Sequence, residues 1–96
     1  MAEPHPFGPE AVPRRSLTAR MRKFRGKLLV ASGPHAVELD ELGAFVFRRV
    51  DGSATVQGIA EQLAAEYDVS VEVAAQDIGE LLAQLADSGM VEAAGP

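Results

Sequence analysis

The sequence has no cysteine, so disulfide bonds and thiolate metal sites are excluded. No apolar run approaches the ~18 residues that a membrane-spanning helix needs. Residues 1–30 contain no apolar stretch followed by a small-residue cleavage site, which argues against a secretory signal. We therefore expect a cytoplasmic protein that has no membrane partner.

Signatures of catalysis and of cofactor binding are also lacking. There is no Gly-rich phosphate loop, no nucleophile elbow and no pair of carboxylates placed for acid–base catalysis. His5 and His35 are isolated in the sequence, and Asp77 and Glu80 share a helix face without a nearby His. We expect no metal, no cofactor and no enzymatic activity.

Basic residues are missing from the second half of the chain. All nine Lys and Arg residues precede Val50, and nine acidic residues but no basic one follow it. The net charge of −5 conceals this division. Such an asymmetry indicates either a surface for a partner or charge complementarity within the fold.

The length and composition predict one folded domain. A chain of 96 residues that is 47% hydrophobic forms a single domain with a modest core. Pro4, Pro6, Pro9 and Pro13 disfavour helix and central strand in the first residues. We expect a disordered tail over residues 1–16, an ordered domain over residues 17–92 and a small C-terminal tail over residues 93–96.

Three short strands are expected before residue 40. Leu17, Ala19 and Met21 alternate with polar residues, which predicts a half-buried first strand. The pair Arg25-Gly26 favours a tight hairpin into a second strand over Lys27–Ala31. The turn at residues 32–34 then leads into a third strand over His35–Leu39.

Three helices follow, and each has a capping residue at its start. Asp40, Thr55 and Ser70 are good N-caps, and Gly89 suits the left-handed position that closes the last helix. Apolar residues recur at helical spacing after each cap: Leu42, Phe45, Val46 and Val50; Val56, Ile59, Ala60, Leu63 and Tyr67; Ala74, Ile78, Leu81, Leu82 and Leu85. The sequence therefore predicts an α+β domain, in which an N-terminal three-stranded antiparallel sheet precedes three helices in a winged helix-turn-helix-like order.

Three segments in this order resemble the PqqD-like family, also called RiPP recognition elements. The first is ELDELGAFVFRRVDG (38–52), where Asp40 replaces the usual Asn and Leu42 a common Thr. The second is TVQGIAEQLAAEYDV (55–69), where Gly58 replaces the usual acidic residue. The third is QDIGELLAQLADSGMV (76–91). The resemblance covers residues 17–92 and implies a non-catalytic module that binds the leader of a ribosomally made precursor peptide and presents it to a modifying enzyme or protease.

The resemblance also implies where the leader binds. In this family the leader adds as a strand beside the third strand and lies against the third helix. On this chain the implied peptide-binding residues are His35, Ala36, Val37, Glu38 and Leu39 of the strand, with Val73, Asp77, Ile78, Leu81 and Gln84 of the helix. The alternative is a solvated helix face beside an edge too short to need a partner.

The basic residues and the helix-turn-helix leave other functions open. Arg20, Arg22 and Lys23 either are solvated, or face the acidic helices, or steer an acidic leader or a partner enzyme. Related modules serve radical-SAM enzymes and lasso-type proteases and cyclases.

A winged-helix DNA-binding regulator is the alternative function, but residues 69–91 contain no Lys or Arg for phosphates, so we expect no nucleic-acid partner. A structural subunit of an enzyme complex is a third possibility.

Overall fold

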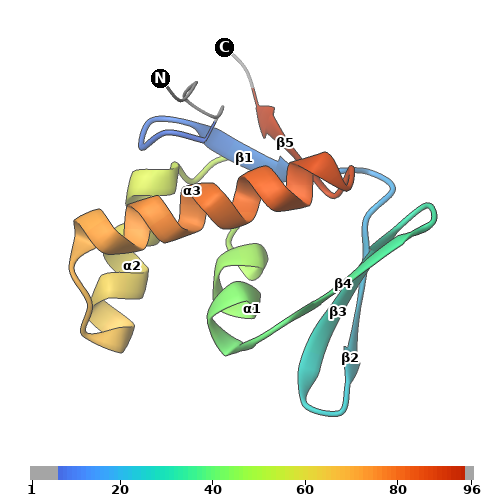
Figure 1. The fold of residues 1–96 in the computed structure, drawn as a ribbon. Coiled ribbons are helices and arrows are strands. Elements are labelled where there is room, and N and C mark those ends of the chain that lie inside the picture. The colour runs from blue at the N-terminus through green and yellow to red at the C-terminus, as the bar shows by residue number, and fades with distance from the viewer. Residues whose placement is uncertain (1–6, 95–96) are drawn as a thin grey trace.

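The computed structural model describes residues 7–94, which form five strands and three helices (Figure 1). In chain order they are β1 (Val12–Arg15), β2 (Arg20–Phe24), β3 (Lys27–Ser32), β4 (His35–Leu39), α1 (Glu41–Arg48), α2 (Val56–Tyr67), α3 (Val71–Asp87) and β5 (Val91–Ala94). The predicted α+β class with three helices is confirmed.

Strands β2, β3 and β4 form an antiparallel sheet with β3 in the centre. The β2–β3 hairpin turns at Arg25 and Gly26, whose φ angles of 54° and 80° are both positive. Positive φ at both central residues matches the right-handed twist of the strands, as the sequence predicts. Leu28, Val30 and Ser32 of β3 are buried on the face that meets the helices.

Each helix begins at the residue that the sequence predicts. The side chains of Asp40, Thr55 and Ser70 accept hydrogen bonds from the N–H groups three residues later, at 2.8, 3.0 and 3.2 Å. These bonds satisfy donors that the first turn of a helix leaves free. Gly89 closes α3 with a φ of 73°, and the N–H of Met90 donates to the Leu85 carbonyl at 2.9 Å.

One core joins the helices to the sheet. Helix α3 crosses the molecule beside α2, while α1 packs against β3 and β4 (Figure 1). Buried residues from every helix meet there, including Phe47, Ile59, Leu63, Ala74, Ile78, Leu82 and Leu85. The apolar stripe predicted for the first helix is partly wrong: Leu42 is 45% exposed, and Phe47 is buried in its place, so α1 turns Gly43, Ala44, Val46 and Phe47 inward.

The predicted sheet and tail require correction. Five strands form two sheets, because β1 pairs antiparallel with β5 in addition to the β2–β3–β4 sheet. The prediction of disorder over residues 1–16 is therefore wrong for residues 7–16, where Phe7 and Pro13 are buried. The predicted C-terminal tail is likewise wrong at residues 93–94, which belong to β5. Residues 1–6 and 95–96 lie outside the described residues.

The predicted half-burial of the first strand is wrong for Leu17 and Met21, whereas Ala19, directly before β2, is partly buried against the core. Leu17 is fully exposed and precedes the strand, and all five residues of β2 are exposed. The reason is position: β2 is an edge strand of a sheet that projects from one side of the helices (Figure 1), and α1 packs against β3 and β4. Within residues 7–94, no helix has the length and apolar character needed to cross a membrane.

Candidate functional site

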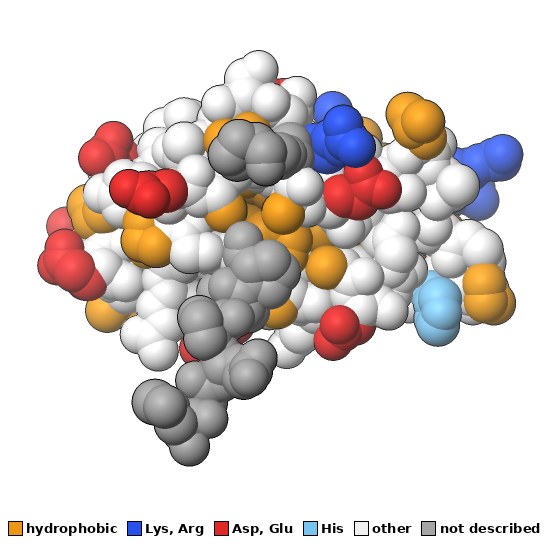
Figure 2. Space-filling view, turned by 90° about the horizontal axis from the view of Figure 1, so that it is seen from above, with side chains coloured by type: hydrophobic (Ala, Val, Ile, Leu, Met, Phe, Trp, Pro, Cys, Tyr) orange, Lys and Arg blue, Asp and Glu red, His pale blue; other side chains and the backbone are white. Residues whose placement is uncertain are grey.

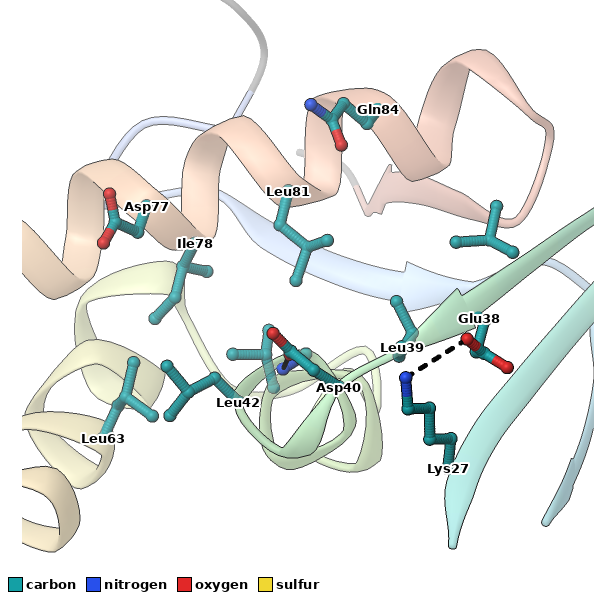
Figure 3. A pocket seen from close by; sticks show the side chains of 13 residues that line it. Lys27, Glu38, Leu39, Asp40, Leu42, Leu63, Asp77, Ile78, Leu81 and Gln84 are labelled. Atoms are coloured by element: carbon teal, nitrogen blue, oxygen red, sulfur yellow. Dashed lines mark hydrogen bonds and ion pairs between the residues drawn. The ribbon is translucent and has the colours of Figure 1, made fainter. Parts of the chain in front are cut away.

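A groove of about 360 Å³ opens between β4, the start of α1 and the middle of α3 (Figure 3). Its apolar lining comes from four elements: Val37 and Leu39, Leu42 and Val46, Leu63, and Ile78 and Leu81. Its polar lining consists of Lys27, Glu38, Asp40, Asp77 and Gln84, with Gly43 completing the wall. The arrangement suits an extended ligand with apolar side chains and some charge.

The close junction of β4 and α1 shapes this groove. Helix α1 starts two residues after Leu39, and Asp40 between them caps it. A Cβ added at Gly43 would lie 3.2 Å from the Leu39 Cβ and 3.3 Å from an Asp40 carboxylate oxygen. Glycine at this position therefore allows the first turn of α1 to pack directly on β4 and sets the width of the groove.

Strand β4 borders the groove with a free edge. Among the described residues β4 pairs only with β3, so its outer backbone N–H and C=O groups have no strand partner. Helix α3 lies across the groove from this edge, with Leu81 pointing toward it (Figure 3). An exposed strand edge beside apolar pockets is the geometry that strand addition requires.

The charged groups of the groove differ in their partners. The Lys27 ammonium lies 3.4 Å from a Glu38 carboxylate oxygen. One Asp40 oxygen accepts the capping bond from the Gly43 N–H. The Asp77 carboxylate is exposed and makes no hydrogen bond or ion pair with any residue from 7 to 94.

A cluster of side chains outside the groove lining joins α1 to α2. The Arg49 guanidinium lies 3.4 Å from the centre of the Phe45 ring and donates to Gln62 at 2.9 Å. The Tyr67 hydroxyl donates to Glu41 at 2.9 Å, and this bond raises the pKa of Tyr67 above its ordinary value. These contacts hold α2, which contributes Leu63 to the groove, against α1.

The structure brings most of the predicted peptide-binding residues together. Seven of the ten line the groove: Val37, Glu38, Leu39, Asp77, Ile78, Leu81 and Gln84. His35 and Ala36 are exposed on β4 before the groove begins, and Val73 is 51% exposed on α3 outside the lining. Sequence reasoning missed Lys27, Asp40, Leu42, Gly43, Val46 and Leu63 as groove residues. None of them carried a signal for the groove in the sequence, where Leu42, Val46 and Leu63 belong to predicted apolar stripes and Asp40 to a helix cap.

The predicted steering residues lie elsewhere. Arg20, Arg22 and Lys23 are exposed on β2, which is the edge of the sheet opposite β4, and none of them lines the groove. None forms an ion pair with a carboxylate in residues 7–94. Over the same range, no group of three or more His, Cys, Asp or Glu side chains is placed to hold a metal ion.

Comparisons with known proteins agree on one family. The family model for coenzyme PQQ synthesis protein D (PqqD) matches residues 26–91. The bifunctional coenzyme PQQ synthesis protein C/D of Methylorubrum extorquens is 33% identical over 93 residues, which are 95% of this chain and 25% of that protein. A PqqA binding protein of Xanthomonas oryzae pv. oryzae is 35% identical over 63 residues, or 66% of this chain and 68% of that protein. The chain thus spans a quarter of the first of these relatives.

Solved structures extend the likeness to the fold. The solution structure of the PqqD truncation of Methylobacterium extorquens PqqCD, described as a stand-alone RiPP recognition element, has a TM-score of 0.80 and 32% identity, covering 95% of this chain and 99% of that one. Lasso peptide synthetase B1 complexed with its leader peptide has a TM-score of 0.75 at 20% identity, covering 84% and 98%, and shares the fold. With the family model matching over most of its length, this chain belongs to the PqqD family.

Proposed function

We propose that this chain is a non-catalytic recognition module for the leader of a ribosomally synthesised precursor peptide. The free edge of β4 beside the apolar groove carries the proposal. A relative named as a PqqA binding protein and a structural neighbour solved with a leader peptide support it. Because ribosomal precursors are made in the cytoplasm, the proposal places the chain there.

The leader adds to the sheet as a strand. Backbone groups on the outer edge of β4, over His35–Leu39, pair with the backbone of the leader and supply affinity that is independent of sequence. Apolar leader side chains enter the groove against Ile78 and Leu81, which supply selectivity. Val73, outside the groove lining, contacts the leader only if the leader extends along the first turn of α3.

Titration of ¹⁵N-labelled protein with the leader of the precursor encoded beside it tests this proposal. We expect amide shifts over His35–Leu39 and residues 77–84. The variant Leu81→Asp should weaken binding by about tenfold or more, since it places a charge in the apolar part of the groove. The matched control is Leu17→Asp, at an exposed position away from the groove. Shifts confined to α2 or to the turn at residues 25–26, together with normal binding by Leu81→Asp, would refute the groove assignment.

We propose a second role for Arg20, Arg22 and Lys23, which is to contact an acidic face of the maturation enzyme. That enzyme is a radical-SAM enzyme or a lasso-type protease or cyclase. The three cations lie on the sheet edge opposite the groove and have no carboxylate partner in the described chain. A module that holds the leader on one edge therefore offers the other edge to the enzyme.

Reversing these three charges to Glu separates the two roles. We expect the affinity for the leader to stay within about twofold, while association with the co-encoded enzyme weakens at least tenfold and loses its salt dependence. Arg48→Glu is the control, because Arg48 is an exposed cation on α1 rather than on β2. Equal loss of leader binding and enzyme binding in the triple variant would show that the two surfaces are not separate.

A winged-helix DNA-binding regulator is the alternative. The order of a β2–β3 hairpin and three helices is what suggested this alternative from the sequence. The third helix opposes this function: α3 contains no Lys or Arg and carries Glu72, Asp77, Glu80 and Asp87, which repel phosphate. Peptide recognition therefore accounts better for the same elements.

A further inference from the structure

The groove is acidic, although the strand on the opposite edge of the sheet is basic. Three carboxylates line it, from Glu38, Asp40 and Asp77, against one ammonium, from Lys27. No other Lys or Arg side chain is in the lining. At neutral pH the lining therefore carries three negative charges and one positive charge. An acidic ligand in this groove would be repelled rather than attracted.

The three carboxylates are not equivalent, because two already have partners. Glu38 pairs with Lys27, and Asp40 accepts from the first turn of α1. The Asp77 carboxylate has no partner among residues 7–94 and is exposed at one end of the groove, beside Ile78 (Figure 3). It is the acidic group in the lining that is free to receive a cation from a ligand.

The apolar surroundings of Asp77 fix the kind of ligand. Leu42, Leu63 and Ile78 lie at the same end of the groove, so a side chain that reaches Asp77 follows or precedes an apolar side chain seated among them (Figure 3). We infer that the leader segment in this groove carries a Lys or Arg next to an apolar anchor and that Asp77 is its counter-charge. The inference rests on the leader-binding function proposed above and specifies the chemistry of the leader at that site.

The exposure of Asp77 determines how much its ion pair with a leader cation should contribute to binding. An exposed ion pair contributes modestly, so one cation–Asp77 contact should change the dissociation constant by about two- to fivefold. The effect should shrink as salt rises from about 0.05 to 0.5 M, because a shorter Debye length screens the attraction between exposed charges. The basic β2 does not reverse the preference, because its cations lie on the other edge of the sheet.

The test uses the leader of the co-encoded precursor in its natural form and as synthetic variants, in which each Lys or Arg is replaced singly, once by norleucine and once by Glu. Binding is followed by fluorescence anisotropy with the full chain and with Asp77→Asn. The matched control is Glu80→Gln, an exposed acid on the same helix that does not line the groove. We expect one cation whose loss weakens binding to the wild type and to Glu80→Gln but not to Asp77→Asn. Asp77→Lys should in turn favour the Glu form at that position, as a double-mutant cycle reads out.

Three results are decisive against the inference. If the leader binds and no replaced cation weakens binding, the charge assignment is wrong while the proposed function stands. If Asp77→Asn and Glu80→Gln lose the same selectivity, the effect belongs to the general charge of α3 rather than to Asp77. If no form of the leader binds at any salt concentration, the proposed function fails and the inference fails with it.

Discussion

Gly58 occupies the third position of α2, where its N–H donates to the capping oxygen of Thr55 at 3.0 Å. On the side of residue 58 the bond uses only the backbone N–H, which any residue except proline supplies. The φ angle of Gly58 is not positive either, so neither feature requires glycine. An alanine Cβ would lie 3.3 Å from the Thr55 Oγ1, a contact that a small shift relieves. We predict that Gly58→Ala stabilises the protein by about 0.5 kcal/mol through helix propensity. Urea unfolding measures this, and a loss of stability would mean that the added methyl displaces the cap.

Asp51 makes the turn between α1 and α2 sensitive to acid. Its carboxylate accepts from the N–H groups of Ala54 and Ser53, and these bonds hold the pKa of Asp51 below its ordinary value of 3.8. A lowered pKa in the folded state stabilises the fold at pH values well above 3.8, and this contribution is lost as the pH falls through the folded pKa. We predict that Asp51→Asn is less stable than the wild type at neutral pH and that the difference closes below pH 3.8.

Thermal unfolding across this pH range tests the Asp51 prediction, with Glu80→Gln as the control. Glu80 makes no hydrogen bond or ion pair with another described residue, so its variant should follow the wild type at each pH. A constant difference between Asp51→Asn and the wild type from neutral to acidic pH would show that the charge of Asp51 does not matter to the turn.

The elements divide into those that local sequence determines and those that depend on distant contacts. The helix starts at Asp40, Thr55 and Ser70 and the hairpin at Arg25-Gly26 were predictable, because caps and primed turns are local and have specific residue requirements. The pairing of Arg14 with Glu92 was not, since the two residues are 78 positions apart and Pro13 next to them argues against a strand. Pro13 is tolerated because, besides its pairing with β5, β1 forms a single bridge among the described residues, Arg14 with Asp51, where Pro13 contributes its carbonyl, which accepts from the Gly52 N–H at 3.0 Å.

The groove shows the same division. Its walls on β4 and α3 followed from a family resemblance that names those two elements. Leu63 and Lys27 enter the groove from α2 and β3, and only the tertiary packing of those elements brings them there. Periodicity identified Leu63 as a core residue, and its side chain is indeed buried, but periodicity does not tell which core residues also border an opening.

The N-terminal segment before β2 should contribute strongly to stability. Phe7 is 1% exposed and packs in the same core as the helices, although it precedes β1. We predict that Phe7→Ala costs about 3 kcal/mol or more, because it removes a buried ring and leaves a cavity. Leu17→Ala, at a fully exposed apolar position in the same N-terminal region, should change stability by less than about 0.5 kcal/mol. Chemical denaturation of both variants provides the comparison, and equal effects would contradict the packing of Phe7.

At the scale of the whole molecule, the charge division of the sequence becomes a spatial one. Figure 2 shows several acidic side chains at the end of the molecule where α2 and α3 lie, and Lys and Arg side chains from the middle toward the end where the β2–β3–β4 sheet projects, with a few acidic side chains near them. Two ion pairs link carboxylates to basic residues within residues 7–94, Arg14 with Glu92 and Lys27 with Glu38, so most charges remain available to partners. The two ends therefore attract partners of opposite charge.

The separation of basic β2 from acidic α3 limits how the protein can bind duplex DNA. Arg20, Arg22 and Lys23 on β2 attract phosphates at low ionic strength, but the acidic α3 prevents a helix from entering a groove of the duplex. We predict weak retention of duplex DNA at about 0.02 M salt, with no preference for sequence, that disappears by about 0.15 M as few phosphate contacts are involved. The triple reversal of these cations to Glu should abolish the retention at low salt, while Arg48→Glu should reduce it little. A gel shift that persists at about 0.15 M salt with micromolar protein, and that survives the triple reversal, would restore the DNA-binding alternative.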